Sequence, residues 1–223
     1  AERTLHRWLT AAGQVRPPRR KPRRISFRKS VTASVARDSN DVWTIDLKGW
    51  FRTTNGERVE PLTIRDLASR YLLWVQPLAP RDERSIKAVC TRLFEDHGRP
   101  RVMRCDLGPP FFGRGPHDFS CLSLWWWRQG IHVEFVRRGV IHNNEHEQMH
   151  QVLKAEVPIA ETCRAQTQRL EKWRHKYNPG RPHDALVRHP PATVYRSQPA
   201  ALPRLQLPKY PAGWLVRRVR AHG

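Results

Sequence analysis

Long hydrophobic runs, paired cysteines and acidic residues are all scarce in this sequence. No apolar run approaches the roughly 20 residues that a transmembrane helix requires. The polar, arginine-dotted N-terminus does not have the pattern of a signal peptide. The four cysteines are widely spaced and form no CxxC pair, which argues against a disulfide framework or a cysteine-rich zinc knuckle. We therefore expect a cytoplasmic protein with buried free thiols and no membrane partner.

Basic residues outnumber acidic ones two to one. The chain of 223 residues has 41 Lys and Arg against 20 Asp and Glu, a formal net charge of +21 and a pI near 11.2. This length allows one good core with small appendages. Such a charge attracts phosphate backbones or anionic membranes. Because no basic amphipathic membrane helix is present, nucleic acid is the favoured partner, and a merely basic soluble protein is the alternative.

Periodicity and turn residues predict an α/β fold, with a mixed sheet flanked by helices. Three strands, at 42–53, 58–66 and 71–76, are expected to form an antiparallel meander with Asn55-Gly56 as its hairpin turn. Strands and helices then alternate, with further strands at 101–105 and 132–136 and helices at 82–97, 117–129, 143–156 and 160–177.

The N-terminal region is basic and interrupted by proline. Residues 4–12 predict a helix that ends at Gly13, and an arm without acids follows from Arg16 to Lys29. We interpret the arm as extended and in contact with DNA, with a solvated linker as the alternative. Its candidate DNA-binding residues are Arg19, Arg20, Lys21, Arg23 and Arg24.

The C-terminal region predicts little regular structure. Residues 190–211 are punctuated by proline and suggest a linker, and residues 214–220 suggest one strand without a partner. The chain begins at Ala1 and contains only Met103 and Met149. We therefore expect it to be a fragment of a longer protein.

Three acids occupy positions typical of metal ligands. Asp46 and Asp106 each end a predicted strand, and Glu147 lies on the predicted helix 143–156. Two divalent ions about 3.5–4 Å apart, held by carboxylates, can activate the attacking oxygen and stabilise the leaving oxygen of a phosphodiester. The three acids in a basic chain therefore predict a Mg²⁺ or Mn²⁺ site that faces a polyanion.

The helix that carries Glu147 offers further candidates. Helical spacing places Asn143, Glu147, His150 and Lys154 on one face, with Met149 and its apolar neighbours roughly opposite. We take Asn143, His150 and Lys154 as candidate DNA-binding residues. An ordinary solvated polar face is the alternative.

A zinc-protease motif overlaps the same helix. Residues 146–150 match H-E-x-x-H, in which two histidines bind zinc and the glutamate acts as a base. No H-x-x-G-x-x-H extension follows, although Glu161 or Glu171 could supply a third ligand. A zinc metalloprotease is therefore a remote alternative.

Four segments together resemble the bacterial insertion-sequence transposases that carry a retroviral-integrase-type, or DDE, catalytic core. They are residues 41–51 (DVWTIDLKGWF), 104–111 (RCDLGPPF), 130–154 and 173–186 (WRHKYNPGRPHDAL). The last of them resembles the family signature Y-N-x-x-R-P-H-x-A-L. The segments occur in the family's order and span about residues 41–196.

The resemblance implies an RNase H-like fold and metal-dependent DNA cleavage and strand transfer at the ends of an insertion element. Asp46, Asp106 and Glu147 correspond to the family's metal ligands, which hold Mg²⁺ or Mn²⁺, as two ions in our prediction. Lys154 corresponds to a basic residue placed against the transferred DNA end. The resemblance also implies that the protein binds double-stranded DNA, forms a homo-oligomer on that DNA and associates with the nucleoid.

The resemblance also divides the chain into four regions. Residues 1–14 resemble the end of a helix-turn-helix domain, residues 15–40 form the basic linker, and residues 41–196 form the catalytic core. Residues 197–223 are expected to be a proline-rich linker and the start of a truncated small β-barrel.

Several positions depart from the family pattern around the three acids. Leu107 and Gln148 stand where Asn and Arg are usual, and Asn144 stands where Gly is usual. Because the acids are retained but their neighbours are not, a catalytically inactive remnant that only binds DNA is the second hypothesis.

Overall fold

The structure, a computed structural model, describes residues 2–13, 33–78, 80, 82–113, 118–136 and 144–199. The chain divides into two units, residues 1–32 and 33–223, which we consider separately. The first unit contains α1 (Glu2–Ala11), which corresponds to the helix predicted for residues 4–12. In the described ranges, no helix is long and apolar enough to cross a membrane.

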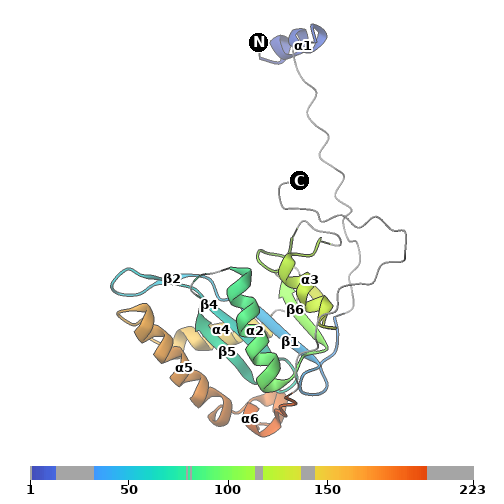
Figure 1. Cartoon of the computed structure of the whole chain (residues 1–223). Coiled ribbons are helices and arrows are strands. Elements are labelled where there is room, and N and C mark those ends of the chain that lie inside the picture. The colour runs from blue at the N-terminus through green and yellow to red at the C-terminus, as the bar shows by residue number, and fades with distance from the viewer. Residues whose placement is uncertain are drawn as a thin grey trace, which may run out of the picture. The chain divides into compact units, whose positions relative to one another are not determined.

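The second unit is built on a five-stranded mixed sheet in the order β5-β4-β1-β6-β7 (Figure 1). The strands are β1 (Val42–Leu47), β4 (Pro61–Asp66), β5 (Leu72–Pro77), β6 (Val102–Asp106) and β7 (His132–Val136). β4 pairs antiparallel with both β1 and β5, whereas β6 runs parallel to β1 and to β7. The predicted meander continued by parallel strands is therefore confirmed.

The hairpin around Asn55-Gly56 lies outside this sheet. The strand predicted for 42–53 is interrupted after β1, because Gly49 has a φ of 88°, which extended strands do not adopt. The short strands β2 (Phe51–Arg52) and β3 (Arg58–Val59) then pair only with each other. The hairpin is thus a separate two-stranded ribbon, and the meander consists of β1, β4 and β5.

Helices cover the sheet on two sides (Figure 1). α2 (Glu83–His97) and α3 (Cys121–Arg128) pack on one face, and α4 (Asn144–Glu156) and α5 (Cys163–Gly180) contribute to a second core on the other. Local signals set the helix starts, since the side chains of Asp82, Ser120 and Thr162 accept hydrogen bonds from the first turns of α2, α3 and α5. Two short helices, η3 (Asp184–Leu186) and α6 (Pro191–Val194), follow.

The two cores use alternate residues of the strands. The larger core includes Trp43 and Ile45 of β1 together with Phe94 and Trp126 of the covering helices. The smaller core joins Leu72 and Val75 of β5 to α4 and α5 through Met149, Leu153, Leu170, Trp173 and Tyr177. Because strand side chains alternate between faces, the residues between the apolar ones on β1 face the side of α4.

Segments at both ends of the predicted core domain pack against its strands and helices. The carboxamide oxygen of Asn40 accepts hydrogen bonds from the Trp43 indole at 3.0 Å and from the Tyr195 hydroxyl at 3.1 Å. Tyr195 also stacks on Tyr71, with 4.4 Å between ring centroids. Residues 33–40 and 190–199, which the sequence predicts as linker, are therefore ordered on the core by long-range contacts. Residues 200–223, including the predicted strand 214–220, lie outside the described residues.

We expect Gly98→Ala to destabilise the protein by at least about 2 kcal/mol. Gly98 ends α2 with φ 88° and ψ 168°, a conformation essentially restricted to glycine. An added Cβ would also lie 2.3 Å from the carbonyl oxygen of Gln198. The measurement is the free energy of unfolding from urea denaturation.

Gly130→Ala is the matched control for this substitution. Gly130 also has a positive φ, of 80°, but nothing lies within 4 Å of an added Cβ. We expect a loss of only about 1 kcal/mol, from backbone strain alone. Equal losses for the two variants would contradict the contact between Gly98 and the segment that carries Gln198.

Candidate active site

The face of the sheet that α4 covers carries polar side chains. On β1, Thr44 and Asp46 alternate with the apolar residues of the larger core. Thr63 and Arg65 of β4 are paired with Asp46 and Thr44, and Arg104 of β6 is paired with Thr44. Paired residues on neighbouring strands share a face. With Asp106, two residues beyond Arg104, we call this set the polar face; its members are Thr44, Asp46, Thr63, Arg65, Arg104 and Asp106.

Asp46 and Asp106 lie at the same level of adjacent strands. The parallel pairing of β1 and β6 runs from Val42–Val102 to Thr44–Arg104, and each aspartate follows its strand's last paired residue by two positions. Because side chains alternate along a strand, the two aspartates lie on the same face of the sheet, each beyond the last paired residue of its strand. Both carboxylates affect the buried thiol of Cys105. Burial, and then the negative charges of Asp106 and Asp46, raise the pKa of this thiol well above its usual value.

The loop after β6 holds the Asp106 side chain. The backbone N–H of Gly108 donates to a carboxylate oxygen of Asp106 at 3.2 Å. A Cβ at position 108 would approach that carboxylate to 3.1 Å. Leu107, at the position where the transposases usually have Asn, is 39% exposed between these residues.

A buried ion pair lies deeper on the polar face. Arg104 and Glu134, which are neighbours in the pairing of β6 with β7, form an ion pair with side chains only 4% and 5% exposed. Although burial opposes ionisation, hydrogen bonds from the Ser34 N–H and from Arg104 lower the pKa of Glu134. Arg104 also donates to the Ser34 carbonyl at 2.7 Å. The pair therefore joins two parallel strands and residue 34.

α4 crosses the polar face with both of its HExxH histidines turned inward. Both Nε2 atoms contact the Thr63 hydroxyl, at 2.7 Å from His146 and 2.9 Å from His150. Nδ1 of His146 contacts the Thr44 hydroxyl at 2.8 Å. Nδ1 of His150 lies 3.8 Å from a carboxylate oxygen of Asp46.

Both imidazoles are uncharged at neutral pH. Burial lowers the pKa of His150 to about 3, assisted by the positive charges of Lys48, Arg65 and Lys154. Burial and the neighbouring His150 hold the pKa of His146 well below its usual range. Neutral imidazoles are the form that accepts hydrogen bonds and binds metals.

Helical spacing placed His150 with the solvated residues of α4, but it is 9% exposed beside Met149. The reason lies in the sheet, because α4 packs on hydroxyl and charged groups, so its buried side needs polar residues as well as apolar ones. Glu147, one residue after His146, is exposed, as are Gln148 and Lys154.

Asp46, His146 and His150 form a group of three potential metal ligands. One ligand atom from each lies within 4.8 Å of the others. Among the described residues, no other group of three His, Cys, Asp or Glu side chains lies close enough to hold a metal ion. The group contains neither Asp106 nor Glu147. The assignment of Asp46, Asp106 and Glu147 as ligands therefore stays a prediction. The sequence predicts His146 only as a ligand in the zinc-protease alternative and not among the residues of the DDE site.

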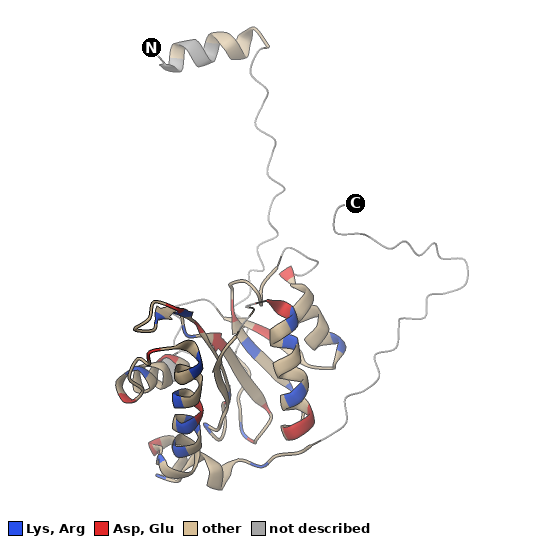
Figure 2. Cartoon of the chain, turned by 60° about the vertical axis from the view of Figure 1, so that its left-hand side comes forward, with Lys and Arg blue, Asp and Glu red and all other residues tan. Residues whose placement is uncertain are grey.

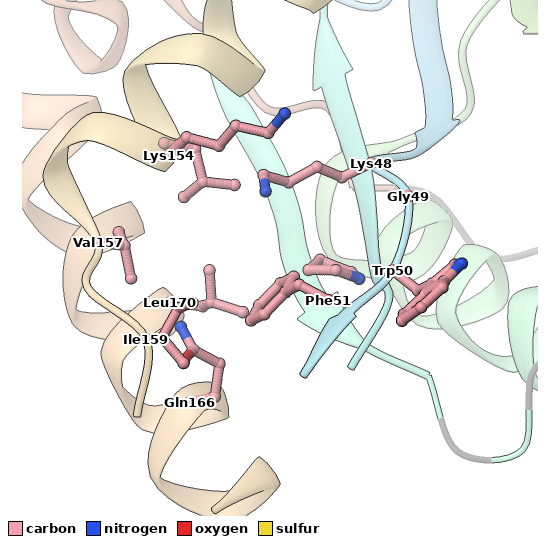
Figure 3. A pocket seen from close by; sticks show the side chains of 11 residues that line it. Lys48, Gly49, Trp50, Phe51, Lys154, Val157, Ile159, Gln166 and Leu170 are labelled. Carbon is pink, nitrogen blue, oxygen red and sulfur yellow. The ribbon is translucent and has the colours of Figure 1, made fainter. Parts of the chain in front are cut away.

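A cavity of about 350 Å³ is lined in part by Lys48 and Lys154, two residues whose charges act on His150 (Figure 3). Lys48, just beyond β1, and Lys154 of α4 extend toward each other at one end. Apolar side chains line the rest, among them Phe51, Leu153, Val157, Ile159 and Leu170. Burial and the charge of Lys154 lower the pKa of Lys48 to about 8. Two close ammonium groups over an apolar wall suit an anion attached to an apolar or aromatic group.

Further basic residues lie on the helices that flank the sheet (Figure 2). α5 carries five of them and the single acid Glu171, the basic ones being Arg164, Arg169, Lys172, Arg174 and Lys176. The other predicted DNA-binding residues cannot be placed, because Arg19, Arg20, Lys21, Arg23 and Arg24 lie outside the described residues, as does Asn143.

The segment that resembles the Y-N-x-x-R-P-H signature attaches α5 to the edge of the sheet. The Asn178 side chain accepts from the Leu72 N–H at 2.9 Å and donates to the Leu72 carbonyl at 3.0 Å. Tyr177 is buried and its ring lies 5.5 Å from that of His183. These signature residues thus hold the edge strand β5 and helix α5 together. In the sequence they lie beyond Asp46, Asp106 and Glu147.

Integrase cores are among the solved structures that are similar to this chain. The catalytic core domain of BIV integrase matches with a TM-score of 0.51 and 14% sequence identity, over 70% of this chain and 94% of that one. The fold is RNase H-like. The HTLV-2 integrase catalytic core domain, in complex with magnesium, gives a TM-score of 0.49 and 11% identity, over 71% of this chain and 98% of that one. No protein-family model matches the chain.

Proposed function

We propose that this protein is a polynucleotidyl transferase of the DDE type, which cleaves and joins DNA strands. The observation that supports the proposal is the position of Asp46 and Asp106 near the ends of adjacent parallel strands, each two residues beyond the last paired residue. Two carboxylates side by side in a chain of net charge +21 suit a divalent-metal site that meets a polyanion.

In this proposal Asp46, Asp106 and Glu147 hold Mg²⁺ or Mn²⁺, as two ions. The residues fit such ions because all three offer carboxylate oxygens. When bound, the ions would supply Lewis-acid stabilisation of the attacking and leaving oxygens. The Gly108 N–H orients the Asp106 carboxylate, and Glu147 approaches from α4, the helix that also contacts Thr44 and Thr63 of the sheet.

The finer assignment, an insertion-sequence transposase, rests on the sequence resemblance over residues 41–196. We include in it the proposals that residues 1–14 derive from a helix-turn-helix domain, residues 15–40 from a basic linker, and residues 197–223 from a linker and a small β-barrel. A homo-oligomer on double-stranded DNA belongs to the same proposal.

The first test is nicking of supercoiled plasmid DNA in Mg²⁺ or Mn²⁺, which needs no knowledge of the preferred sequence. We expect the plasmid to be converted to open circles only when the metal is present, and a chelator to abolish the conversion. The structure also gives a reason to keep the second function, a DNA-binding remnant, since Asp106 and Glu147 lie outside the compact group around Asp46. Salt-sensitive DNA binding without nicking would support the remnant and overturn the transferase.

We expect the double variant Lys48→Gln/Lys154→Gln to bind DNA more weakly and with a smaller dependence on salt. The two lysines lie at one end of the cavity, and their charges act on His150. Each phosphate contact contributes about 0.9 to the slope of log K against log salt, so the slope should fall by about 1.8. Fluorescence anisotropy with a labelled duplex at several salt concentrations measures it.

The matched control removes two charges from a different helix. Lys87→Gln/Arg92→Gln changes exposed residues of α2, which packs on the opposite face of the sheet from α4. This variant should bind DNA with a slope closer to that of the wild type. An equal decrease for both double variants would indicate general charge attraction and contradict a specific role for Lys48 and Lys154.

A further inference from the structure

The group formed by Asp46, His146 and His150 has a ligand set different from that of a magnesium site. It combines two imidazoles with one carboxylate, from β1 and from one buried face of α4. Magnesium prefers oxygen ligands, whereas imidazole suits zinc, cobalt, nickel and copper. Two histidines at i and i+4 with a carboxylate are a common zinc-binding set.

The hydrogen bonds of Thr63 limit which nitrogen atom of His150 is available. Its hydroxyl has one hydrogen and three possible acceptors, which are the Asp46 carbonyl at 3.1 Å and the Nε2 atoms of His146 and His150 at 2.7 and 2.9 Å. If the hydrogen goes to Asp46 or to His146, then His150 must donate from Nε2. A neutral imidazole carries one proton, so Nδ1 of His150 is then a bare acceptor.

In that arrangement, Nδ1 of His150 faces the Asp46 carboxylate as an acceptor. The two acceptor atoms, Nδ1 of His150 and Oδ2 of Asp46, are 3.8 Å apart. The distance is too long for a direct hydrogen bond. A metal ion with bonds of about 2.0–2.2 Å holds its ligand atoms roughly 3–4 Å apart, so a cation between these two atoms fits the spacing.

The third ligand already has a supporting partner. His146 is held by Thr44 at 2.8 Å through Nδ1, and its ring centroid lies 4.9 Å from that of His150. Metal-binding histidines usually have such a partner on the second ring nitrogen, which fixes the orientation of the ring. Thr44 therefore orients the His146 ring and Thr63 orients the His150 ring, while the contact of Thr63 with Nε2 of His146 is released when a metal binds at that nitrogen.

We propose that Asp46, His146 and His150 form a binding site for a transition-metal ion of the zinc class. Because Asp46 is shared, and on the basis of the function proposed above, such an ion displaces Mg²⁺ or Mn²⁺ from the candidate active site and inhibits DNA cleavage. Lys48, Arg65 and Lys154 lie close enough to act on His150 electrostatically. Their positive charges oppose the binding of a cation, which makes the site a sensor of excess metal and not a permanent structural site.

Cobalt(II) is the probe for the site itself, because its visible absorption reports nitrogen ligands directly. We expect the metal-stripped full chain to bind Co²⁺ with tetrahedral-type bands that one equivalent of Zn²⁺ removes. His150→Gln and Asp46→Asn should each lower the Co²⁺ affinity by more than the roughly 10–100-fold typical for loss of a supporting partner. Thr44→Val, which removes such a partner of His146, should lower it about tenfold.

His132→Gln is the matched control, since His132 is an exposed histidine of β7. It should leave the Co²⁺ spectrum and affinity unchanged. Circular dichroism and thermal unfolding of every variant separate loss of metal from loss of fold. No Co²⁺ bands in the wild type, or bands unaffected in both folded variants, His150→Gln and Asp46→Asn, would overturn the site.

Inhibition is tested separately as the ratio of nicking rates with and without Zn²⁺. The ratio should fall at least tenfold in the wild type at Zn²⁺ concentrations that saturate the Co²⁺ site, and by much less in His150→Gln. An unchanged ratio in the wild type would overturn the competition for Asp46. The spectrum decides the metal site without DNA, so a protein that binds Co²⁺ but never nicks DNA would refute the proposed function and support the site.

Discussion

Replacing Asp46 by asparagine is expected to lower metal-dependent nicking of supercoiled DNA by about a thousandfold or more. Loss of a metal ligand removes several kcal/mol of transition-state stabilisation, and about 1.4 kcal/mol corresponds to a factor of ten in rate. Asparagine has nearly the same size as aspartate, so the packing of β1 should be retained. The measurement is the initial rate of open-circle formation in Mn²⁺, with thermal unfolding of each variant as the check on folding.

Asp184→Asn is the matched control for the loss of one acidic charge. Asp184 lies on η3 with its side chain 93% exposed, in an ion pair with Arg188, whose side chain is 85% exposed. It should nick DNA at the wild-type rate. A rate for Asp46→Asn within about tenfold of the wild type would refute the metal-ligand role of Asp46.

The other two acids test the prediction that the structure leaves open. Asp106→Asn should resemble Asp46→Asn, because the two carboxylates lie in register at the same end of the sheet. Glu147→Gln should also abolish nicking if Glu147 moves toward the aspartates when metal and DNA bind. Full activity of Glu147→Gln would show that Glu147 is not a metal ligand. Of the three proposed acids, only Asp46 and Asp106 would then remain in the site.

Breaking the buried ion pair of Arg104 and Glu134 is expected to have the largest effect on stability. Arg104→Met should lower the free energy of unfolding by about 3–5 kcal/mol, because it leaves Glu134 charged and buried without its partner. Both side chains are almost completely buried, at 4% and 5% exposed. Denaturant titration measures the loss, which corresponds to roughly 10 °C in melting temperature for a protein of this size.

Two further variants distinguish this explanation from a general loss of packing. The double variant Arg104→Met/Glu134→Leu removes both charges and should recover much of the lost stability. Arg92→Met breaks a pair with Asp96 that is exposed, with side chains 74% and 54% accessible, and should change stability by less than about 1 kcal/mol. If the double variant were as unstable as the sum of its single changes, the lost stability would come from packing and not from the unpaired charge.

The same pair predicts part of the acid sensitivity of the protein. Glu134 has a pKa below its usual 4.5 in the folded state, so it binds fewer protons when folded than when unfolded. Its contribution to stability is therefore complete above pH 4.5 and is lost as the pH falls through the lower folded value. Glu134→Gln should flatten the stability profile over this range, and an unchanged profile would show that other groups control acid unfolding.

The strands, helices and the meander could be predicted because they depend on neighbours in the sequence. The alternation of Trp43 and Ile45 with Thr44 and Asp46 sets the two faces of β1. Asp82, Ser120 and Thr162 mark helix starts through bonds within one turn. The exceptions are also local, since a positive φ at Gly49 separates the hairpin from the sheet, a break that the alternating pattern does not reveal.

The polar face shows where prediction from sequence stopped. Its chemistry depends on which strands become neighbours, and nothing in the residues around Arg104 indicates that Glu134 will pair with it. The position of His150 was missed for a related reason, because a helical wheel assumes an apolar surface beneath the helix. Here the surface contains Thr44 and Thr63, so histidine is a suitable buried residue.

The sequence alone determined the strand ends that carry Asp46 and Asp106, the helix that carries Glu147, the basic charge and the fold class. These properties follow from side-chain alternation, capping and composition, which act over a few residues. Only the tertiary structure decided that Asp46 and Asp106 lie near the ends of neighbouring strands, that His146 and His150 join Asp46, and that Lys48 and Lys154 meet at one end of a cavity. The reason is that strand register and helix docking are set by contacts between residues distant in the sequence, whose free energies no local pattern contains.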